Sequence, residues 1–533
     1  MKKILIFVLC LMPFALMGQS SNVRMTITSD SVVHFSRGLK ELKIAPSSAY
    51  FITASNASVK EKRIADVRCD GIADQVQINA ALTAGYNVRL STGQFNIAAP
   101  ITASVNNITI QGSGRGSTIL NLSASSNCSV ITIDGNGWVI RDLYIDGNAS
   151  VNTGGYPCGI RGVSVENVTI DNVEITDVTE NGIFIRDACA NWIINNVYIH
   201  DMNSCIYGTT EGGGFPTNVK ITNSRFHNTT TDSQIHTIVP ANTTLNWTID
   251  NCNFTGTSGY IDVLWDGSDN CNVVNSTFHS GIQTGEVIHS ALRYFKGASG
   301  TINNNTFLAD TTGTGDTGVS VHCWGADNVI ISNNCIGKRR GGGVLLESWG
   351  AGVYNTKNIT IIGNMFYNSD VLDLNPTISL YVGTSFTLQN VNIIGNNFLD
   401  DRGANALIQY AIVGSGAGTI KNVNISDNVM EGILETGVTF VATTMSDFKI
   451  SNNLFIDIPV GIRFTEGDDI QITGNKFVLC TTPIDVNDSD VVYPLIEGNT
   501  MRGCTNSGTY AGATNEIIGI NVWHDGTYDN SPP

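Results

Sequence analysis

Ionisable side chains gather in the middle of the chain, where they could serve acid–base chemistry. Five of the eight histidines lie between His227 and His322. Short segments there alternate an inward Ile or Val with an outward residue, and parallel in-register strands stack the outward residues into rows. The first row predicted in this way contains Arg161, Phe184, Tyr207, His236, Asp262, His289, Ser320 and Leu345, and the row two places further on contains Arg186, His322 and Glu347. We therefore expect the members from Tyr207 to His289 to lie on consecutive coils of one face.

Such a face suits the cleavage of a polysaccharide, and two reactions remain open. β-Elimination needs a base for the C5 proton of a uronate, a cation beside its carboxylate and an acid for the leaving oxygen. The candidates for these roles are, in order, His289 or His236, Arg293 or Arg339 with Arg340, and Tyr207. Hydrolysis needs two carboxyl groups at a defined separation, and the candidates are Glu286 and Asp316, with Asp232 and Asp262 nearby. The joint presence of His, Tyr and Arg favours elimination. The predicted catalytic residues are Tyr207, His236, Asp262, Glu286, His289, Asp316 and His322.

Aromatic and basic residues occur in the same part of the chain. Trp and Tyr faces can stack on sugar rings, and Arg pairs bidentately with carboxylates. The predicted substrate-binding residues are Trp265, Arg293, Trp324, Arg339, Arg340 and Trp349. The alternative interpretation is a merely solvated face, because outward positions favour polar residues whatever the function. No metal ligand is assigned, although a Ca²⁺ site would find its carboxylates at Asp262, Asp266 and Asp269.

A short repeated pattern must position all of these residues. In the segment 218–226, Ile221 is followed two places later by Asn223 and five places later by Phe226. The pattern recurs at intervals of roughly 22 to 32 residues and gives about fourteen repeats, which indicates a stacked-repeat architecture. From Ile361 onward the Asn comes one place later, at Asn364. We interpret the Asn as structural, because Asn tolerates left-handed bends and stacked amides can hydrogen-bond along the coil axis.

Composition and charge narrow the possible partners. The chain has 533 residues, a charged fraction of 14% and a formal net charge of −17. A strongly acidic chain without a basic stripe argues against a nucleic-acid partner. No segment after the N-terminus is apolar enough for a membrane span.

The two ends of the chain do not carry the repeat. Residues 1–18 resemble a signal peptide, with Lys2-Lys3 before an apolar stretch, so we expect a secreted or periplasmic protein. Residues 19–65 are expected to form a leading β-element or a linker, with strands over 23–27 and 49–53. Residues 505–533 are expected to form a C-terminal cap or a tail.

The segment 66–97 predicts a cap over the first coil. Asp70 or Asp74 can begin a helix whose apolar face would be Val76, Ile78, Ala81 and Leu82, and strands are expected over 87–90 and 95–97. Such a cover would shield the apolar core and open strand edges of a first coil.

This cap sequence, together with the repeats over 66–504, resembles pectate-lyase-like proteins of the right-handed parallel β-helix superfamily. The resemblance implies an all-β, right-handed parallel β-helix with an N-terminal capping helix. Members include polysaccharide lyases, polygalacturonase-type glycoside hydrolases, epimerases, tailspikes and non-catalytic proteins. The chain lacks the Asn-Thr-Asp, Gly-His-Gly and Arg-Ile-Lys motifs of polygalacturonases, so none of their site residues is transferred and no pectin specificity is inferred.

Two cysteines occupy the same point on neighbouring repeats. Cys480 lies eight places after Ile472, and Cys504 lies eight places after Ile496. Equivalent positions on stacked strands are about 4.8 Å apart, which is within disulfide reach, so we expect a Cys480–Cys504 disulfide in an oxidising compartment.

The sequence as a whole predicts an exported carbohydrate-active enzyme that cleaves a polysaccharide, with elimination ahead of hydrolysis. The alternatives are a glycoside hydrolase that uses a carboxylate pair, and a non-catalytic glycan-binding, surface or tailspike-like protein. Fold alone does not choose among them. The sequence leaves open whether the protein is a monomer or a homotrimer.

Overall fold

The computed structural model describes residues 25–27, 33–35, 49–228, 233–256, 261–280, 290–309, 318–337, 342–350, 354–367, 376–401, 408–486, 490–506, 517–519, 521–523 and 528–529. The expected signal segment, 1–18, lies outside these ranges. The chain divides into two compact units, Met1–Tyr50 and Phe51–Pro533. In the first unit, β1 (Met25–Ile27) pairs antiparallel with β2 (Val33–Phe35). The second unit therefore begins at Phe51 rather than at residue 66.

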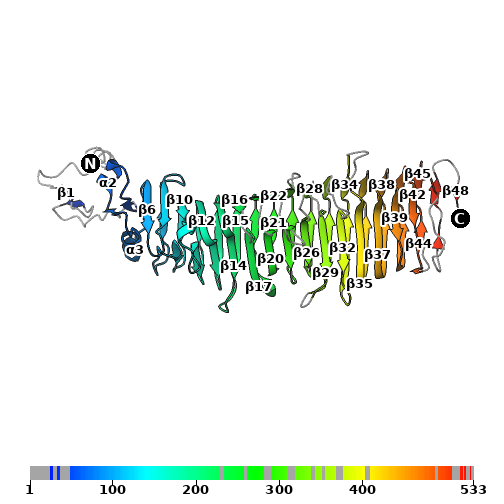
Figure 1. The fold of residues 1–533 in the computed structure, drawn as a ribbon, viewed down its shortest axis with the longest axis horizontal. Helices are drawn as coiled ribbons and strands as arrows, with labels where there is room; N and C mark the ends of the chain where they lie inside the picture. The colour runs from blue at the N-terminus through cyan, green and yellow to red at the C-terminus, as the bar shows by residue number, and fades with distance from the viewer. Residues whose placement is uncertain are drawn as a thin grey trace, which may run out of the picture. The chain divides into compact units, whose positions relative to one another are not determined.

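The second unit is a stack of parallel coils, each built from three strand segments (Figure 1). It makes about 13 turns, against the expected fourteen or so. One coil consists of β15 (Thr217–Thr222), β16 (Arg225–Asn228) and β17 (Ile235–Thr244), and the next of β18 (Thr248–Asp250), β19 (Asn253–Gly256) and β20 (Ile261–Asp269). β15 pairs with β18, β16 with β19 and β17 with β20, all in parallel. We call these ladders the first, second and third sheets.

Apolar residues of the repeat fill the interior of the coils. Ile221, Ile249 and Ile302 of the first sheet are fully buried. In the second sheet, equivalent Phe rings stack from coil to coil. Their centroid separations are 5.1 Å for Phe226–Phe254, 4.7 Å for Phe254–Phe278 and 4.8 Å for Phe278–Phe307. Offset stacking at such separations adds to the stabilisation that burial alone provides.

A ladder of buried asparagines joins the coils from within. The Asn364 main-chain N–H donates to Asn396 Oδ1 at 2.9 Å, and its Nδ2 donates to the same oxygen at 3.0 Å. Asn364 Nδ2 also donates to the carbonyl of Ile331 at 2.9 Å. The same arrangement recurs at Asn305, Asn334, Asn396, Asn428, Asn453, Asn475 and Asn499. Polar groups at the bend, which would be costly to bury unpaired, are thereby satisfied.

A second set of asparagines supplies the left-handed bends. Asn223, Asn251 and Asn304 have φ values of 52°, 54° and 56°, in the region that Asn tolerates best among non-glycine residues. The repeated Asn of the sequence pattern therefore belongs to two different sets, the bend asparagines and the buried ladder. Asn two places after the anchor forms the bend, whereas Asn three places after it belongs to the buried ladder. Where the buried ladder alone retains Asn, the bend position is taken by glycine, as at Gly363 and Gly395, or by Asp427 before Asn428.

The N-terminal cap is present, with one difference from the prediction. Helix α3 (Gln75–Thr83) buries Ile78, Ala81 and Leu82, but Val76 is 59% exposed and does not belong to the apolar face. Gln75, the first residue of the helix, is buried in its place. The expected strands are confirmed as β5 (Val88–Leu90) and β6 (Gly93–Ile97).

Three elements before α3 also lie in the second unit, apart from Tyr50 at the start of the first of them. Strand β3 (Tyr50–Thr53), which the sequence predicts, pairs in parallel with β4 (Val67–Arg68). Helix α2 (Val59–Ile64) was not predicted, although a capping box with Ser58 and Glu61 marks its start.

The C-terminal segment continues the stack instead of abandoning it. β46 (Ile517–Ile518) pairs in parallel with β44 (Leu495–Glu497), and β47 (Asn521–Trp523) pairs in parallel with β45 (Thr500–Arg502). Asn521 Oδ1 accepts from the Asn499 main-chain N–H at 3.1 Å and extends the buried ladder. The last strand, β48 (Tyr528–Asp529), turns antiparallel onto β47. Among the described residues, no helix is long and apolar enough to cross a membrane.

We predict that Asn396→Ala destabilises the chain strongly, whereas Asn397→Ala does not. Asn396 is buried, and its loss leaves the Asn364 main-chain N–H and Nδ2 without their acceptor, a cost on the order of 3 kcal/mol. Asn397, the next residue, is exposed. Urea unfolding followed by circular dichroism measures the difference, and equal stability of the two variants would contradict the role given to the ladder.

Candidate functional site

The outward side chains of the third sheet form two rows that we call the site face. The contributing strands are β11 (Cys158–Val163), β12 (Thr169–Arg186), β14 (Tyr198–Thr209), β17, β20, β23 (Ser290–Phe295), β26 (Val319–Trp324), β29 (Val344–Ser348) and β32 (Ile378–Val382). Their register gives a first row of Arg161, Phe184, Tyr207, His236, Leu264, Arg293, His322 and Leu345. The second row is Val163, Arg186, Thr209, Ile238, Asp266, Phe295, Trp324, Glu347 and Tyr381.

The register corrects the predicted first row after His236. His236 pairs with Leu264 rather than with Asp262, and His322 pairs with Arg293 in the first row instead of lying in the second. A strand that slips by two residues keeps every side chain on its face, so alternation does not distinguish the two alignments. The first row is therefore less polar than predicted, with Leu264 at its centre.

Asp262 and Ser320 do not belong to the site face. Both are buried next to an equally buried inward residue, and Asp262 is 6% exposed. On the coil after Ser320 the aligned position is Gly343, where an added Cβ would meet the core ring of Phe366 at 2.7 Å. The stacked positions Asp262, Ser320 and Gly343 therefore pack against the core, at the corner of the coil that precedes the third sheet. There, Gln234 Nε2 donates to Asp262 Oδ1 at 2.7 Å.

Rings and a cation contact one another along the first part of the first row. The Arg161 guanidinium lies 5.7 Å from the centroid of Phe184, which stacks on Tyr207 at 5.8 Å with an interplanar angle of 6°. The Tyr207 and His236 rings meet edge to face at 5.2 Å. Both ring nitrogens of His236 are buried.

Further along the face, His322 and Glu347 form a buried pair. His322 Nε2 and Glu347 Oε2 are 2.8 Å apart, and His322 is fully buried. Burial lowers the pKa of His322 to about 4, although the hydrogen bond to Glu347 opposes this shift. Neighbouring Arg293 has its pKa lowered to about 10 by burial, partly offset by the Glu347 charge. His322 is thus a neutral imidazole that a large substrate does not reach in this conformation, which suits a positioning role better than direct proton transfer.

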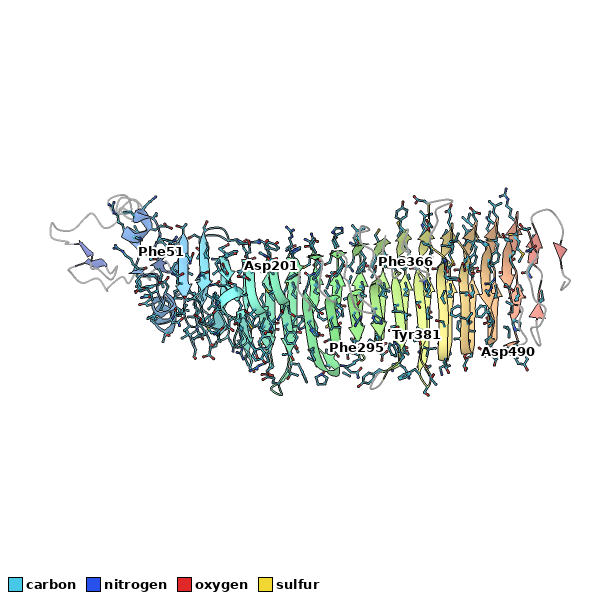
Figure 2. All side chains as sticks on the ribbon, in the orientation of Figure 1. Phe51, Asp201, Phe295, Phe366, Tyr381 and Asp490 are labelled. Atoms are coloured by element: carbon cyan, nitrogen blue, oxygen red, sulfur yellow. The ribbon has the colours of Figure 1, made fainter. Side chains whose placement is uncertain are left out.

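An aromatic platform covers this pair. The Trp324 ring is 5.4 Å from Trp349 and 4.8 Å from Phe295, and the two tryptophans are nearly parallel, at 19°. Trp324 Nε1 donates to the Trp349 carbonyl at 2.8 Å. Trp349 and Tyr381 are each 39% exposed (Tyr381 and Phe295 are labelled in Figure 2).

Phe295 and Tyr381 were missed in the sequence. The strand register would have identified them. When Leu292 and Leu380 are aligned as inward residues, Phe295 and Tyr381 each fall in the second row.

Trp265 was wrongly assigned to substrate binding. It is fully buried and meets Trp247 edge to face, with 6.0 Å between ring centroids. The next residue along the strand, Asp266, is instead the outward residue, and it forms an ion pair with Lys296 at 3.1 Å. Alternation explains the error, because Trp265 follows an outward residue and must point inward.

Several predicted residues lie outside the described part of the chain: Asp232, Glu286, His289, Asp316, Arg339 and Arg340. Within the described part, no three His, Cys, Asp or Glu side chains are grouped to hold a metal ion. The suggested calcium ligands do not converge. Asp262 is at the buried corner, Asp266 is on the site face, and Asp269 is half-buried, with a pKa that burial raises.

The predicted Cys480–Cys504 disulfide is not formed in this structure, where both residues are thiols. The two residues nevertheless follow paired strands, and the interaction with Cys480 lowers the pKa of Cys504.

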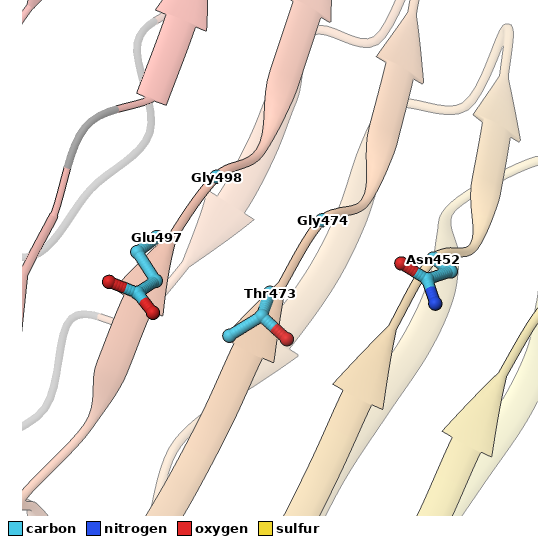
Figure 3. Close-up of a pocket in the computed structure, with 5 residues that line it drawn as sticks. All are labelled: Asn452, Thr473, Gly474, Glu497 and Gly498. Carbon is cyan, nitrogen blue, oxygen red and sulfur yellow. The ribbon is translucent and has the colours of Figure 1, made fainter.

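A shallow depression of about 470 Å³ lies away from the site face, near the C-terminal end of the stack. It is lined by Asn452, Thr473, Gly474, Glu497 and Gly498, at the bend between the first and second sheets (Figure 3). Glu497 is its only charged group, so it does not bring together the residues that either reaction needs.

We predict that His322 makes stability fall as the pH drops from about 6.5 to about 4. The unfolded chain binds a proton at His322 near pH 6.5, whereas the folded chain resists protonation until about pH 4. The loss amounts to about 3 kcal/mol at the acid end. His322→Gln retains a donor for Glu347 but does not titrate. Thermal unfolding at pH 4 and pH 7.5 should show a smaller pH effect in His322→Gln than in the wild type. An equal pH effect in both proteins would show that His322 does not resist protonation.

Comparison with known proteins bears on the fold. Residues 237–411 match the family model described as a right handed beta helix region. No curated protein sequence matches the chain. A mannuronic acid specific polysaccharide family 6 lyase from human gut microbiota has 13% identity and a TM-score of 0.44, covering 65% of this chain and 85% of that one.

Two further solved structures have other functions. The catalytic domain of an α-1,3-glucanase in complex with nigerose has 13% identity and a TM-score of 0.37, covering 72% of this chain and 63% of that one. A surface adhesin of Streptococcus pneumoniae has 16% identity and a TM-score of 0.40, covering 71% and 86%. Fold alone does not specify an activity. The chain is a right-handed parallel β-helix protein, and the resemblance to that superfamily is confirmed at the level of fold, without a specific member.

Proposed function

We propose that this chain is a carbohydrate-active protein that binds a polysaccharide along the site face. The observation that carries the proposal is the aromatic platform, in which Trp324 contacts Phe295 on the preceding coil and Trp349 on the following coil. Phe295 and Trp324 belong to the second row, and Trp349 lies two places after Glu347 of that row. Trp and Tyr present an apolar ring together with a polar tip, which suits them to sites that are apolar and wet at once. Coils about 4.8 Å apart repeat such contacts along a straight line, as an extended sugar chain requires.

A second proposal, cleavage by β-elimination, rests on the contact between Tyr207 and His236 with Arg161 in the same row. Elimination breaks the C5–H and C4–O bonds of a uronate, forms a C4=C5 double bond and protonates the leaving oxygen. Tyr207 would give that proton, and Arg161 would face the uronate carboxylate. The base would be His236 or His289. The His236 ring would have to rotate to bring a buried ring nitrogen to the surface, and His289 lies outside the described residues.

Hydrolysis has less support from the described residues. Asp262 accepts from Gln234, Asp266 is paired with Lys296 and Glu347 is paired with His322. Each carboxylate is thus engaged in a contact of its own, whereas hydrolysis needs two that act together across the scissile bond. Glu286 and Asp316, the predicted pair, lie outside the described residues. Export to the periplasm or medium, which residues 1–18 predict, belongs to the same proposal.

Binding is tested by affinity electrophoresis in gels that contain uronate or neutral polysaccharides. Tyr381→Ala and Trp349→Ala should lose the retardation that the wild type shows, because each removes an exposed ring of the site face. Tyr86→Ala is the matched control, since Tyr86 is 46% exposed at the end of α3 and far along the chain from the site face. Retardation unchanged in Tyr381→Ala and Trp349→Ala would place the binding surface elsewhere.

Cleavage is tested by following the absorbance of unsaturated products together with new reducing ends. Both signals indicate elimination, reducing ends alone indicate hydrolysis, and retardation without either indicates binding only. We expect Tyr207→Phe to lower the elimination rate by about 100-fold or more, the usual contribution of a general acid. Tyr198→Phe, on the second sheet, should leave the rate unchanged. A fully active Tyr207→Phe would remove Tyr207 from the mechanism.

A further inference from the structure

Two thiols near the C-terminal end of the stack occupy equivalent places on adjacent coils. Cys480 follows β41 (Lys476–Val478) and Cys504 follows β45, and these strands pair with Val478 opposite Arg502. The pairing continues past both cysteines, because the Leu479 N–H donates to the Arg502 carbonyl at 2.9 Å and the Thr505 N–H donates to the Cys480 carbonyl at 3.1 Å. Cys480 and Cys504 therefore lie side by side across one strand spacing.

The two thiols have equivalent backbone neighbours but differ in solvent exposure. The Cys480 Sγ lies 3.8 Å from the Phe455 carbonyl, and the Cys504 Sγ lies 3.8 Å from the Phe477 carbonyl, one coil further on. Cys480 is buried, whereas Cys504 is partly exposed. A reagent from solution therefore reaches Cys504 first, and a spacing of about 4.8 Å between strands is within the Cα separation that a disulfide spans.

The proximity of the two thiols makes their acidities unequal. The interaction between the two side chains lowers the pKa of Cys504 and raises that of Cys480. A lowered pKa increases the thiolate fraction of Cys504 at neutral pH, and the thiolate is the nucleophile. Other buried cysteines differ, since burial raises the pKa of Cys271 and Cys323, for example.

We propose that Cys504 and Cys480 form a redox-active pair in which the partly exposed Cys504 attacks a small-molecule disulfide and the buried Cys480 resolves the product. In the first step the Cys504 thiolate bonds to one sulfur of the reagent, and the other sulfur leaves as a thiolate. In the second step Cys480 gives its proton to that leaving thiolate and attacks the Cys504 sulfur, which expels the second half of the reagent. Two protein thiols are oxidised, and one external disulfide is reduced to two thiols.

The resulting bond would link two coils close to the point where the described ladder ends. The last strands of a stack have unpaired edges and few neighbours, so they are expected to open first. A link between residues 480 and 504 limits such opening, because it constrains the intervening residues in the opened state. The pair would then act as a staple that closes on export to an oxidising compartment. It is independent of the polysaccharide proposal.

The test uses the full chain in a Cys335→Ser background, because Cys335 is an exposed thiol that would react separately. The protein is treated with oxidised glutathione, trapped with iodoacetamide, digested and analysed by mass spectrometry. We expect a peptide linked through Cys480 and Cys504, lighter by two hydrogens than its two free components. In Cys480→Ser, glutathione should remain attached to Cys504. In Cys504→Ser, the adduct at Cys480 should form at least about tenfold more slowly, because that thiol is buried and less acidic.

Cys128→Ser is the matched control, since Cys128 is also partly exposed and burial raises the pKa of its thiol. The linked peptide should form unchanged in this variant. In the oxidised wild type, amide exchange over β44 and β45 should be slower than in the reduced protein, a difference that Cys480→Ser should abolish. Absence of the linked peptide, or equal adduct rates at Cys480 and Cys504 in the single variants, would overturn the proposal.

Discussion

In-register stacking of identical backbone bends is the constraint on which this protein depends. Each coil can close only if its corner polar groups find partners, and the buried Asn ladder provides them at one corner. The Asn428 main-chain N–H and Nδ2 both donate to Asn453 Oδ1, and Asn453 does the same toward Asn475. Because each amide serves the preceding coil, the ladder fixes the register of all three sheets together. The outward rows inherit that register.

This dependence explains why the site face is ordered as it is. Aromatic rings stack from coil to coil on the outer side of the third sheet, as the Phe rings do inside the coils. The pairs are Phe184 with Tyr207 and Trp324 with Trp349. Ionisable groups lie below or between these rings, and the most deeply buried, His322, is held neutral. A polysaccharide would therefore meet rings first. Binding by stacking is a more direct consequence of this arrangement than catalysis by the buried pair.

The fold was predictable because its signal is repeated many times, whereas the site depends on alignments that occur once. Ile at the anchor and Asn after it recur coil after coil, so individual irregularities did not matter. The row from His236 onward required choosing between Ile261 and Val263 as the residue aligned with Ile235, and both face inward. The segments before β20 and β23 differ in length, so counting residues from the preceding strand does not decide which of the two is aligned. Phe295 was missed for this reason, and Asp262 was misplaced.

The central claim is that the third sheet, and no other surface of the stack, binds the polysaccharide. Hydrogen exchange of the full chain, with and without a polysaccharide that retards it, tests this claim most directly. Slower exchange is predicted only on third-sheet strands of the site face, on β14 and β17 as well as on β23, β26, β29 and β32, with the first and second sheets of the same coils unchanged. Protection concentrated on β24 (Gly300–Asn303) or β25 (Thr306–Ala309), which belong to those other sheets, would contradict it.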